Sequence, residues 1–271
     1  MAVTASLLRV PVDGAELAVE VRGYGTPVLF IHGFPFDHAL WRHQLAALTR
    51  SRRIAPDLRG AGASSAPDPP DGYSMARYAD DLVAVLDALD VKQAIVCGLS
   101  MGGYILFELL RRHADRVRAA ILCNTKAGAD SPEAKRGRDE LAALAQKEGA
   151  RAVADALLPK ALACATFVAH PDVVAEVKAM MLRAPVPGIV GALRAMRDRP
   201  DSTPLLEAIR IPVLVVAGDD DQITPAAGMQ EMARAIPGAQ FALIAGAGHV
   251  TPLEQPIVAS EALAAFLGRL R

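Results

Sequence analysis

The stretch Gly98-Leu-Ser-Met-Gly-Gly103 decides the fold, because it joins an apolar run to a helical pattern. Residues 94–99 form a short apolar run typical of a buried strand, and residues 101–112 show helical spacing. In this setting G-x-S-x-G predicts a strand–turn–helix elbow that lifts Ser100 above the sheet. The glycines at 98 and 102 let neighbouring backbone pass without a Cβ clash. Ser100 is the candidate nucleophile, and a glycine-rich turn with a capping serine is the alternative.

Strand and helix patterns alternate on both sides of this elbow. We expect strands at residues 7–12, 16–21, 27–32, 53–56, 94–99, 117–123, 212–217 and 240–244. The first two flank a turn at Asp13-Gly14 and predict a hairpin. Helical patterns cover residues 39–48, 75–89, 101–112, 225–235 and 256–270. This alternation predicts an α/β fold, with a mostly parallel eight-stranded sheet and helices on both faces.

The alternation stops between residues 127 and 204, where no strand is expected. Helices are predicted there at residues 132–147, 150–158, 171–182 and 188–197, separated by prolines. We therefore expect a helical cap, or lid, of residues 127–204, inserted into a core domain of residues 1–126 and 205–271. Most apolar side chains of the cap should form its own core. A few should line a mostly apolar pocket over Ser100.

Composition limits the kinds of partner. The chain has 271 residues, 52% of them hydrophobic, and its 29 Lys+Arg and 30 Asp+Glu leave a net charge of −1. A near-neutral chain lacks the charge that holds nucleic acid or an anionic membrane, so we expect neither partner. Three scattered cysteines fit a reducing compartment, and the N-terminus shows no signal-peptide pattern. A cytoplasmic monomer or homodimer is predicted.

Two further loops join the elbow in a resemblance to the α/β-hydrolase superfamily that extends over nearly the whole chain. His32-Gly-Phe-Pro35 follows a predicted strand and resembles that family's oxyanion loop. The resemblance implies that the backbone amides of Phe34 and Met101 form an oxyanion hole. Asp57-Leu-Arg-Gly-Ala-Gly-Ala-Ser64 is similar to a supporting loop of the family. By the same resemblance, Arg59 is structural.

The remaining members of a catalytic triad follow from two more motifs. Gly248-His-Val-Thr-Pro-Leu-Glu-Gln-Pro256 resembles the family pattern G-H-x-x-x-x-E-x-P, which implies His249 as the base. Gly218–Pro225 resembles G-x-x-D-x-x-T-P, which implies Asp221 as the acid, with Asp219 as the next candidate. The order Ser100, Asp221, His249 is the one expected for this fold.

These residues predict a serine hydrolase that forms an acyl-enzyme on a small ester or lactone, without a cofactor or a metal ion. A carboxylesterase is the leading interpretation. The tentative pocket residues are His32, Phe36, Trp41, Asn124 and Val250. Serine at the elbow argues against haloalkane dehalogenases and epoxide hydrolases, because those relatives carry aspartate there.

Several alternatives stay open at this point. Asn124-Thr125 resembles the β-ketoadipate (3-oxoadipate) enol-lactonase branch, and Lys126, Arg136 or Arg138 could bind its acidic lactone. Solvated charges on a cap helix are the competing interpretation of these cations. The same triad also supports perhydrolysis, acyl transfer or carbon–carbon bond hydrolysis. A catalytically inactive small-molecule receptor is the alternative from a different class.

Overall fold

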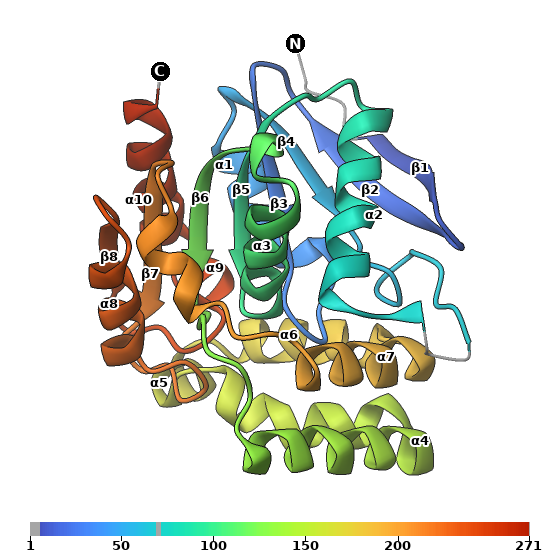
Figure 1. The fold of residues 1–271 in the computed structure, drawn as a ribbon. Coiled ribbons are helices and arrows are strands. Elements are labelled where there is room, and N and C mark those ends of the chain that lie inside the picture. The colour runs from blue at the N-terminus through green and yellow to red at the C-terminus, as the bar shows by residue number, and fades with distance from the viewer. Residues whose placement is uncertain (1–5, 69–71, 271) are drawn as a thin grey trace.

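The computed structural model describes residues 6–68 and 72–270 (Figure 1). An eight-stranded sheet runs in the order β1-β2-β4-β3-β5-β6-β7-β8. Its strands are β1 (Ser6–Val12), β2 (Ala15–Arg22), β3 (Thr26–Ile31), β4 (Ser51–Pro56), β5 (Ala94–Leu99), β6 (Val117–Cys123), β7 (Val213–Gly218) and β8 (Gln240–Ile244). The strand β2 pairs antiparallel with β1 and β4, and the pairs from β4 to β8 are parallel. The predicted fold class is confirmed.

Helices cover both faces of the sheet. One face packs against α2 (Met75–Ala88), α3 (Met101–Arg112) and α8 (Ala226–Ala235). The other packs against α1 (Arg42–Ala47) and α10 (Pro256–Arg269). Short helical turns complete the core domain: η1 (His38–Trp41), η3 (Ala114–Arg116), η4 (Thr203–Ala208) and α9 (Thr251–Glu254). Two separate apolar layers therefore hold the strands in place.

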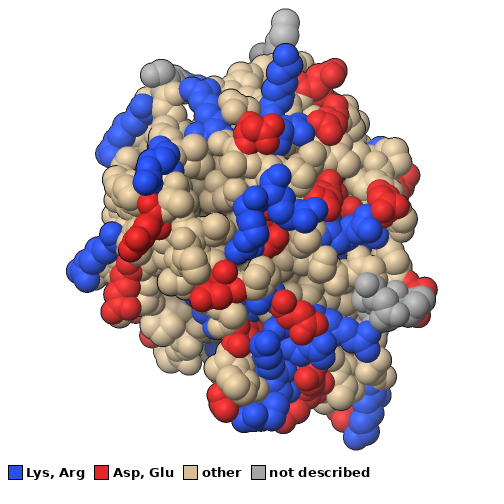
Figure 2. All heavy atoms as spheres, in the orientation of Figure 1, with Lys and Arg blue, Asp and Glu red and all other residues tan. Residues whose placement is uncertain are grey.

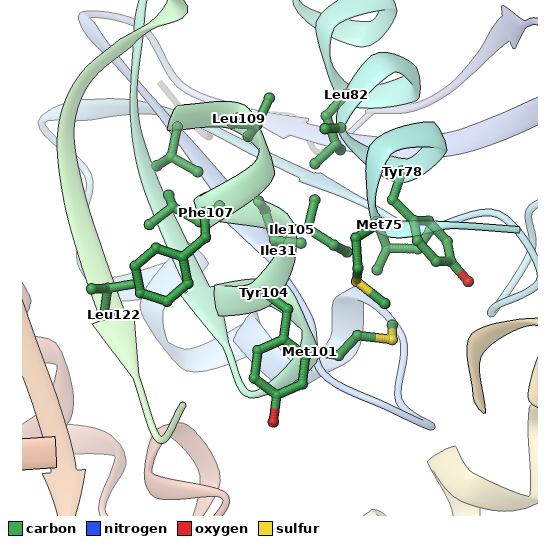
Figure 3. Close-up of a cluster of buried hydrophobic side chains, with 14 of the residues drawn as sticks. Ile31, Met75, Tyr78, Leu82, Met101, Tyr104, Ile105, Phe107, Leu109 and Leu122 are labelled. Carbon is green, nitrogen blue, oxygen red and sulfur yellow. The ribbon is translucent and has the colours of Figure 1, made fainter. Parts of the chain in front are cut away.

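The elbow helix α3 is buried along nearly its whole length. The side chains of Met101, Ile105 and Leu109 belong to the same apolar cluster as Met75 and Leu82 of α2 (Figure 3). Every residue of β5 is buried as well. Since burial of a large apolar side chain contributes about 1.5–3 kcal/mol, the turn between β5 and α3 is fixed from both ends.

The cap lies beyond the carboxyl ends of the parallel strands (Figure 1). It contains α4 (Pro132–Ala161), α5 (Cys164–Ala169), α6 (Pro171–Arg183) and α7 (Val186–Arg197). The predicted break between residues 147 and 150 is present, because Gly149 is non-helical with φ 80°. The helix continues past Pro159 to Ala161, further than predicted, and the short helix α5 was not predicted. Six residues are too few for apolar periodicity to be recognised.

The surface charges are mixed in sign. On the face drawn in Figure 2, basic and acidic side chains are interspersed. Among residues 6–68 and 72–270, no helix combines the length and the apolar character needed to cross a bilayer. Residues 1–5, to which the signal-peptide expectation partly refers, lie outside the described residues.

Candidate active site

Ser100 occupies a strained turn between β5 and α3. Its backbone has φ 54° and ψ −112°, a conformation that residues with a Cβ rarely adopt. A Cβ on Gly98 would overlap the carbonyl of Gly102, and one on Gly102 would overlap the carbonyl of Ile31. The Ser100 amide donates to the carbonyl of Cys123 over 2.9 Å. Glycine at both positions is therefore what lets this turn form.

The predicted oxyanion segments lie against the same turn. Met101 is the first residue of α3, so its amide is one of those without a carbonyl partner inside the helix. That end of the helix also carries the positive end of the helix dipole. On the other side, a Cβ on Gly33 would lie 3.2 Å from Cβ of Ser100, which places the Phe34 loop beside the serine. Both segments are thus next to Ser100.

The structure brings Asp221 and His249 into direct contact. The ring Nδ1–H of His249 donates to Oδ2 of Asp221 over 2.8 Å, and both residues are buried. Burial acts to raise the pKa of Asp221. The hydrogen bonds from His249 and Thr224 outweigh it and hold the pKa well below its usual range. The carboxylate stays ionised and fixes the ring with Nδ1 protonated, which leaves Nε2 as the acceptor.

Asp221 has a complete set of donors. The hydroxyl of Thr224 donates to Oδ2 over 2.6 Å, and the amides of Ile223 and Thr224 donate to Oδ1 over 2.8 and 3.0 Å. Sequence reasoning did not assign a role to Thr224, although it belongs to the D-x-x-T motif. Its three-residue spacing from Asp221 was the available signal.

Asn124, the only asparagine in the chain, is fully buried between the acid and base loops. Its Nδ2 donates to Oδ2 of Asp221 over 2.8 Å and to the carbonyl of Gly248 over 3.2 Å. The hydroxyl of Thr251 donates to its Oδ1 over 2.8 Å. The neighbouring Thr125 hydroxyl donates to the carbonyl of Ser100, so this segment contacts all three loops.

Comparison with known proteins decides the family. A family model described as alpha/beta hydrolase fold matches residues 26–256. This chain belongs to the α/β-hydrolase fold family. A thermophilic esterase from Thermogutta terrifontis (malate bound) has a similar structure, with a TM-score of 0.93 and 39% identity, covering 98% of this chain and 99% of that one.

Two other relatives match over most of their length. The enol-lactonase from Burkholderia xenovorans LB400 has a TM-score of 0.89 and 31% identity, over 96% of this chain and 100% of that one. The AB hydrolase superfamily protein YisY of Bacillus subtilis (strain 168) is 31% identical, over 88% of this chain and 90% of that one. The chain is thus an α/β hydrolase with esterase and lactonase relatives.

The candidate nucleophile Ser100 and the candidate base His249 are not hydrogen-bonded to each other. Among the described residues, Oγ of Ser100 makes no hydrogen bond to His249. Ser100 is 8% exposed and His249 is 3% exposed. Such contacts are often long without substrate and shorten in the reacting complex, so this geometry is compatible with the predicted roles.

A small cavity adjoins the two oxyanion segments. Its volume is about 10 Å³, close to the least that can hold a water molecule. Its walls include His32, Gly33, Phe34, Pro35, Phe36, Leu58, Arg59, Tyr78, Met101, Ala184, Gly188, Ile189 and Ala192. Ala184, which directly follows α6, and the last three, which belong to α7, come from the cap, so the cap forms one wall of this cavity.

Of the tentative pocket residues, His32 and Phe36 line this cavity, whereas Trp41, Asn124 and Val250 do not. The ring of Trp41 packs against Phe30 at a tilt of 49°, with ring centroids 5.2 Å apart, and Val250 is fully buried in the same apolar cluster. His32 is at the cavity wall, with Nδ1 bonded to the carbonyl of Gly33 and Nε2 accepting from the amide of Leu58. Burial lowers the pKa of His32, which keeps this ring neutral.

One group of side chains has the spacing of a metal site. Ligand atoms of Asp37, His38 and Asp57 lie within 4.8 Å of one another. These atoms already have protein partners: Oδ1 of Asp57 accepts from the His38 ring over 2.7 Å, and Oδ2 of Asp37 accepts from Arg183 over 2.6 Å. The donors present favour an internal ion-pair network over a metal centre.

The cations considered for an acidic lactone are paired with carboxylates. Lys126 and Arg138 lie 3.4 and 3.1 Å from Asp130, and Arg136 lies 3.1 Å from Glu133. None of the three lines the cavity beside Phe34. Arg59 does line it, but Asp81 holds its guanidinium with two hydrogen bonds of 2.9 and 2.7 Å.

Proposed function

We propose that this α/β hydrolase cleaves carboxylic esters or lactones of small, mostly apolar substrates through an acyl-enzyme. The observation that carries the proposal is the buried 2.8 Å bond between His249 and Asp221, which Asn124-Thr125 joins by hydrogen bonds to the strained elbow of Ser100. A serine hydroxyl needs such a base to become a nucleophile. Esterases and lactonases among the similar proteins support the same reaction class.

In the proposed mechanism, Oγ of Ser100 attacks the carbonyl carbon while Nε2 of His249 takes its proton. The amides of Phe34 and Met101 stabilise the oxyanion, and loss of one such donor typically costs about 100- to 1000-fold in rate. His249 then protonates the leaving alcohol. Water attacks the acyl-enzyme by the same route and releases the acid. Asp221 stabilises the imidazolium in both steps.

The cavity beside the oxyanion segments favours a short acyl group. Its walls are mainly apolar, and its volume of about 10 Å³ holds no more than a water molecule, so an acyl group enters only if the cap moves, and a short one requires the least movement. Arg59 places a guanidinium at the wall of this cavity, and Asp81 neutralises its charge. We therefore expect neutral esters with short acyl chains to be preferred over acidic ones.

A lactonase is the second candidate, favoured by the 31% identity to an enol-lactonase over nearly the whole chain. An acidic enol-lactone needs a cation near the serine, and the three cations considered for it are paired with Asp130 or Glu133. This observation favours neutral lactones over acidic ones as the lactone substrates.

The test is hydrolysis of p-nitrophenyl acetate, butyrate and octanoate by the wild type and by Ser100→Ala. We expect turnover by the wild type, fastest with the short esters, and its loss in Ser100→Ala. Ser65→Ala is the matched control, since Ser65 lies on a core loop where its hydroxyl accepts from the amide of Glu16. A folded wild type that neither hydrolyses esters or lactones nor reacts with a fluorophosphonate would contradict the proposal and favour a receptor.

A further inference from the structure

The buried carboxylate of Glu254 has four hydrogen-bond donors. This residue ends the short helix α9, five positions after His249, and is 4% exposed. An ionised carboxylate can be buried only when donors replace its water shell. The mechanism proposed above gives this group no role, so its partners need an explanation.

The two oxygens of Glu254 contact different parts of the molecule. Oε1 accepts from the amides of Gly248 and Val250, over 2.9 and 3.1 Å, and these residues flank His249. Oε2 accepts from the amide of Ala163 and the hydroxyl of Thr166, both over 2.7 Å. Ala163 and Thr166 belong to the junction between α4 and α5, which is part of the cap.

Other contacts attach this cap junction, residues 161–166, to the loops of the triad. The amide of His249 itself donates to the carbonyl of Ala161 over 3.1 Å. Oδ2 of Asp220, next to the acid, accepts from the amide of Cys164 over 3.0 Å. A Cβ on Gly248 would lie 2.5 Å from the nitrogen of Ala163, so the two backbones are in contact.

We propose that Glu254 is a positioning residue, which holds the backbone of His249 against the cap junction so that the base is aligned only when this junction is docked. The inference rests on the proposed function, because it assigns His249 as the base. The cap junction is then part of the catalytic framework. Motion that admits substrate must come from other parts of the cap.

The sharpest test changes only the cap side of Glu254. Thr166→Val keeps the shape of the side chain and removes the hydroxyl donor, while Thr166→Ser keeps the donor. A hydrogen bond to a charged group is strong, so we expect Thr166→Val to lower kcat about 10-fold, with KM little changed. Thr166→Ser should recover most of the loss. Equal kcat in the wild type and Thr166→Val would overturn the proposal.

Glu254→Gln tests the carboxylate itself. The glutamine amide has one oxygen, so it can accept hydrogen bonds either from the His249 loop or from the cap junction, but not from both. We expect kcat to fall on the order of 10- to 100-fold, because His249 is then misplaced. Glu108→Gln is the matched control: Glu108 is a similarly buried carboxylate that pairs with Arg111 on α3. This control should lower the melting temperature without lowering kcat. If Glu254→Gln also loses only stability, Glu254 is structural and the proposal fails.

A spectroscopic readout separates this inference from the proposed function. The Nδ1–H proton of His249, bonded to Asp221, should give a downfield proton resonance in the wild type. It should shift or broaden in Thr166→Val and Glu254→Gln but not in Glu108→Gln. A folded wild type that shows this resonance but neither hydrolyses esters or lactones nor reacts with a fluorophosphonate would contradict the proposed function. Unchanged resonances in active variants would contradict the inference alone.

Discussion

Nδ2 of Asn124 lies 2.8 Å from Oδ2 of Asp221, the oxygen that also accepts from His249. The same amide group donates to the carbonyl of Gly248, the residue before His249. One buried side chain therefore fixes Asp221 and the loop of His249 relative to each other.

Replacing Asn124 with leucine should misalign this pair. The carbonyl of Gly248 and the hydroxyl of Thr251 lose their partner, and an unpaired buried polar group costs about 1–3 kcal/mol. We expect kcat for a p-nitrophenyl ester to fall on the order of 10- to 100-fold. Steady-state kinetics with a thermal melt checks this, and a folded variant with wild-type kcat would show that the contact is dispensable.

Asp221→Asn should retain the fold and lose activity by up to about 10⁴-fold, since an amide cannot select the required tautomer of His249. Asp219→Asn is the comparison, because among the described residues the side chain of Asp219 accepts a single hydrogen bond, from the amide of Ala247 over 3.3 Å. It should keep activity within a few-fold. Initial rates on one ester compare the variants, and the reverse ranking would move the acid to Asp219.

Arg59 and Asp81 form a salt bridge in which both side chains are almost fully buried, at 3% and 2% exposure. Removing one partner leaves an uncompensated charge, which typically costs about 3–5 kcal/mol. Arg59→Met or Asp81→Leu alone should therefore lower the free energy of unfolding by about this amount. The double variant should recover part of the loss. Urea unfolding measures all four proteins, and additive losses would argue against a coupled pair.

His38 should make stability depend on pH. Burial acts to lower the pKa of His38, but the carboxylates of Asp57, Asp37 and Glu20 outweigh it, and the pKa is raised. A raised pKa gives stabilisation that is fully present below the unfolded value and is lost as pH rises through the folded value.

The consequence can be measured with His38→Gln. This substitution should cost more unfolding free energy at about pH 6 than at about pH 9, where the wild-type ring is neutral. Urea unfolding at both pH values gives the comparison, with His170→Gln as the control for an exposed histidine of the cap. An equal cost at both pH values would mean that the charged ring adds no stability.

Much of this architecture was predictable because the signals are local. The buried strand β5 appears as an uninterrupted apolar run, and the predicted bounds of β5, β6 and β8 match the structure. The elbow, the D-x-x-T motif and the G-H motif each lie within a few residues. Their meeting at one edge of the sheet follows from the parallel topology.

What could not be predicted depends on contacts between distant segments. The motif that contains His249 includes Glu254, but two of the four donors to this carboxylate lie 88 and 91 residues away, in the cap. The bond from Asn124 to Asp221 spans 97 residues. Hydrophobic periodicity and motif spacing relate residues that are near each other along the chain. They identify a polar residue, but they do not predict which distant residue it contacts in the folded protein.

The position of the cap within the chain has a consequence for synthesis. A ribosome makes Ser100 and the cap junction before Asp220 and Glu254, the two carboxylates to which that junction donates. Until the last quarter of the chain emerges, the amides of Ala163 and Cys164 lack these acceptors. On the roles proposed above, docking of the cap junction and alignment of His249 must both wait for this last part of the chain, so a shorter nascent chain that carries Ser100 lacks the groups proposed to activate it.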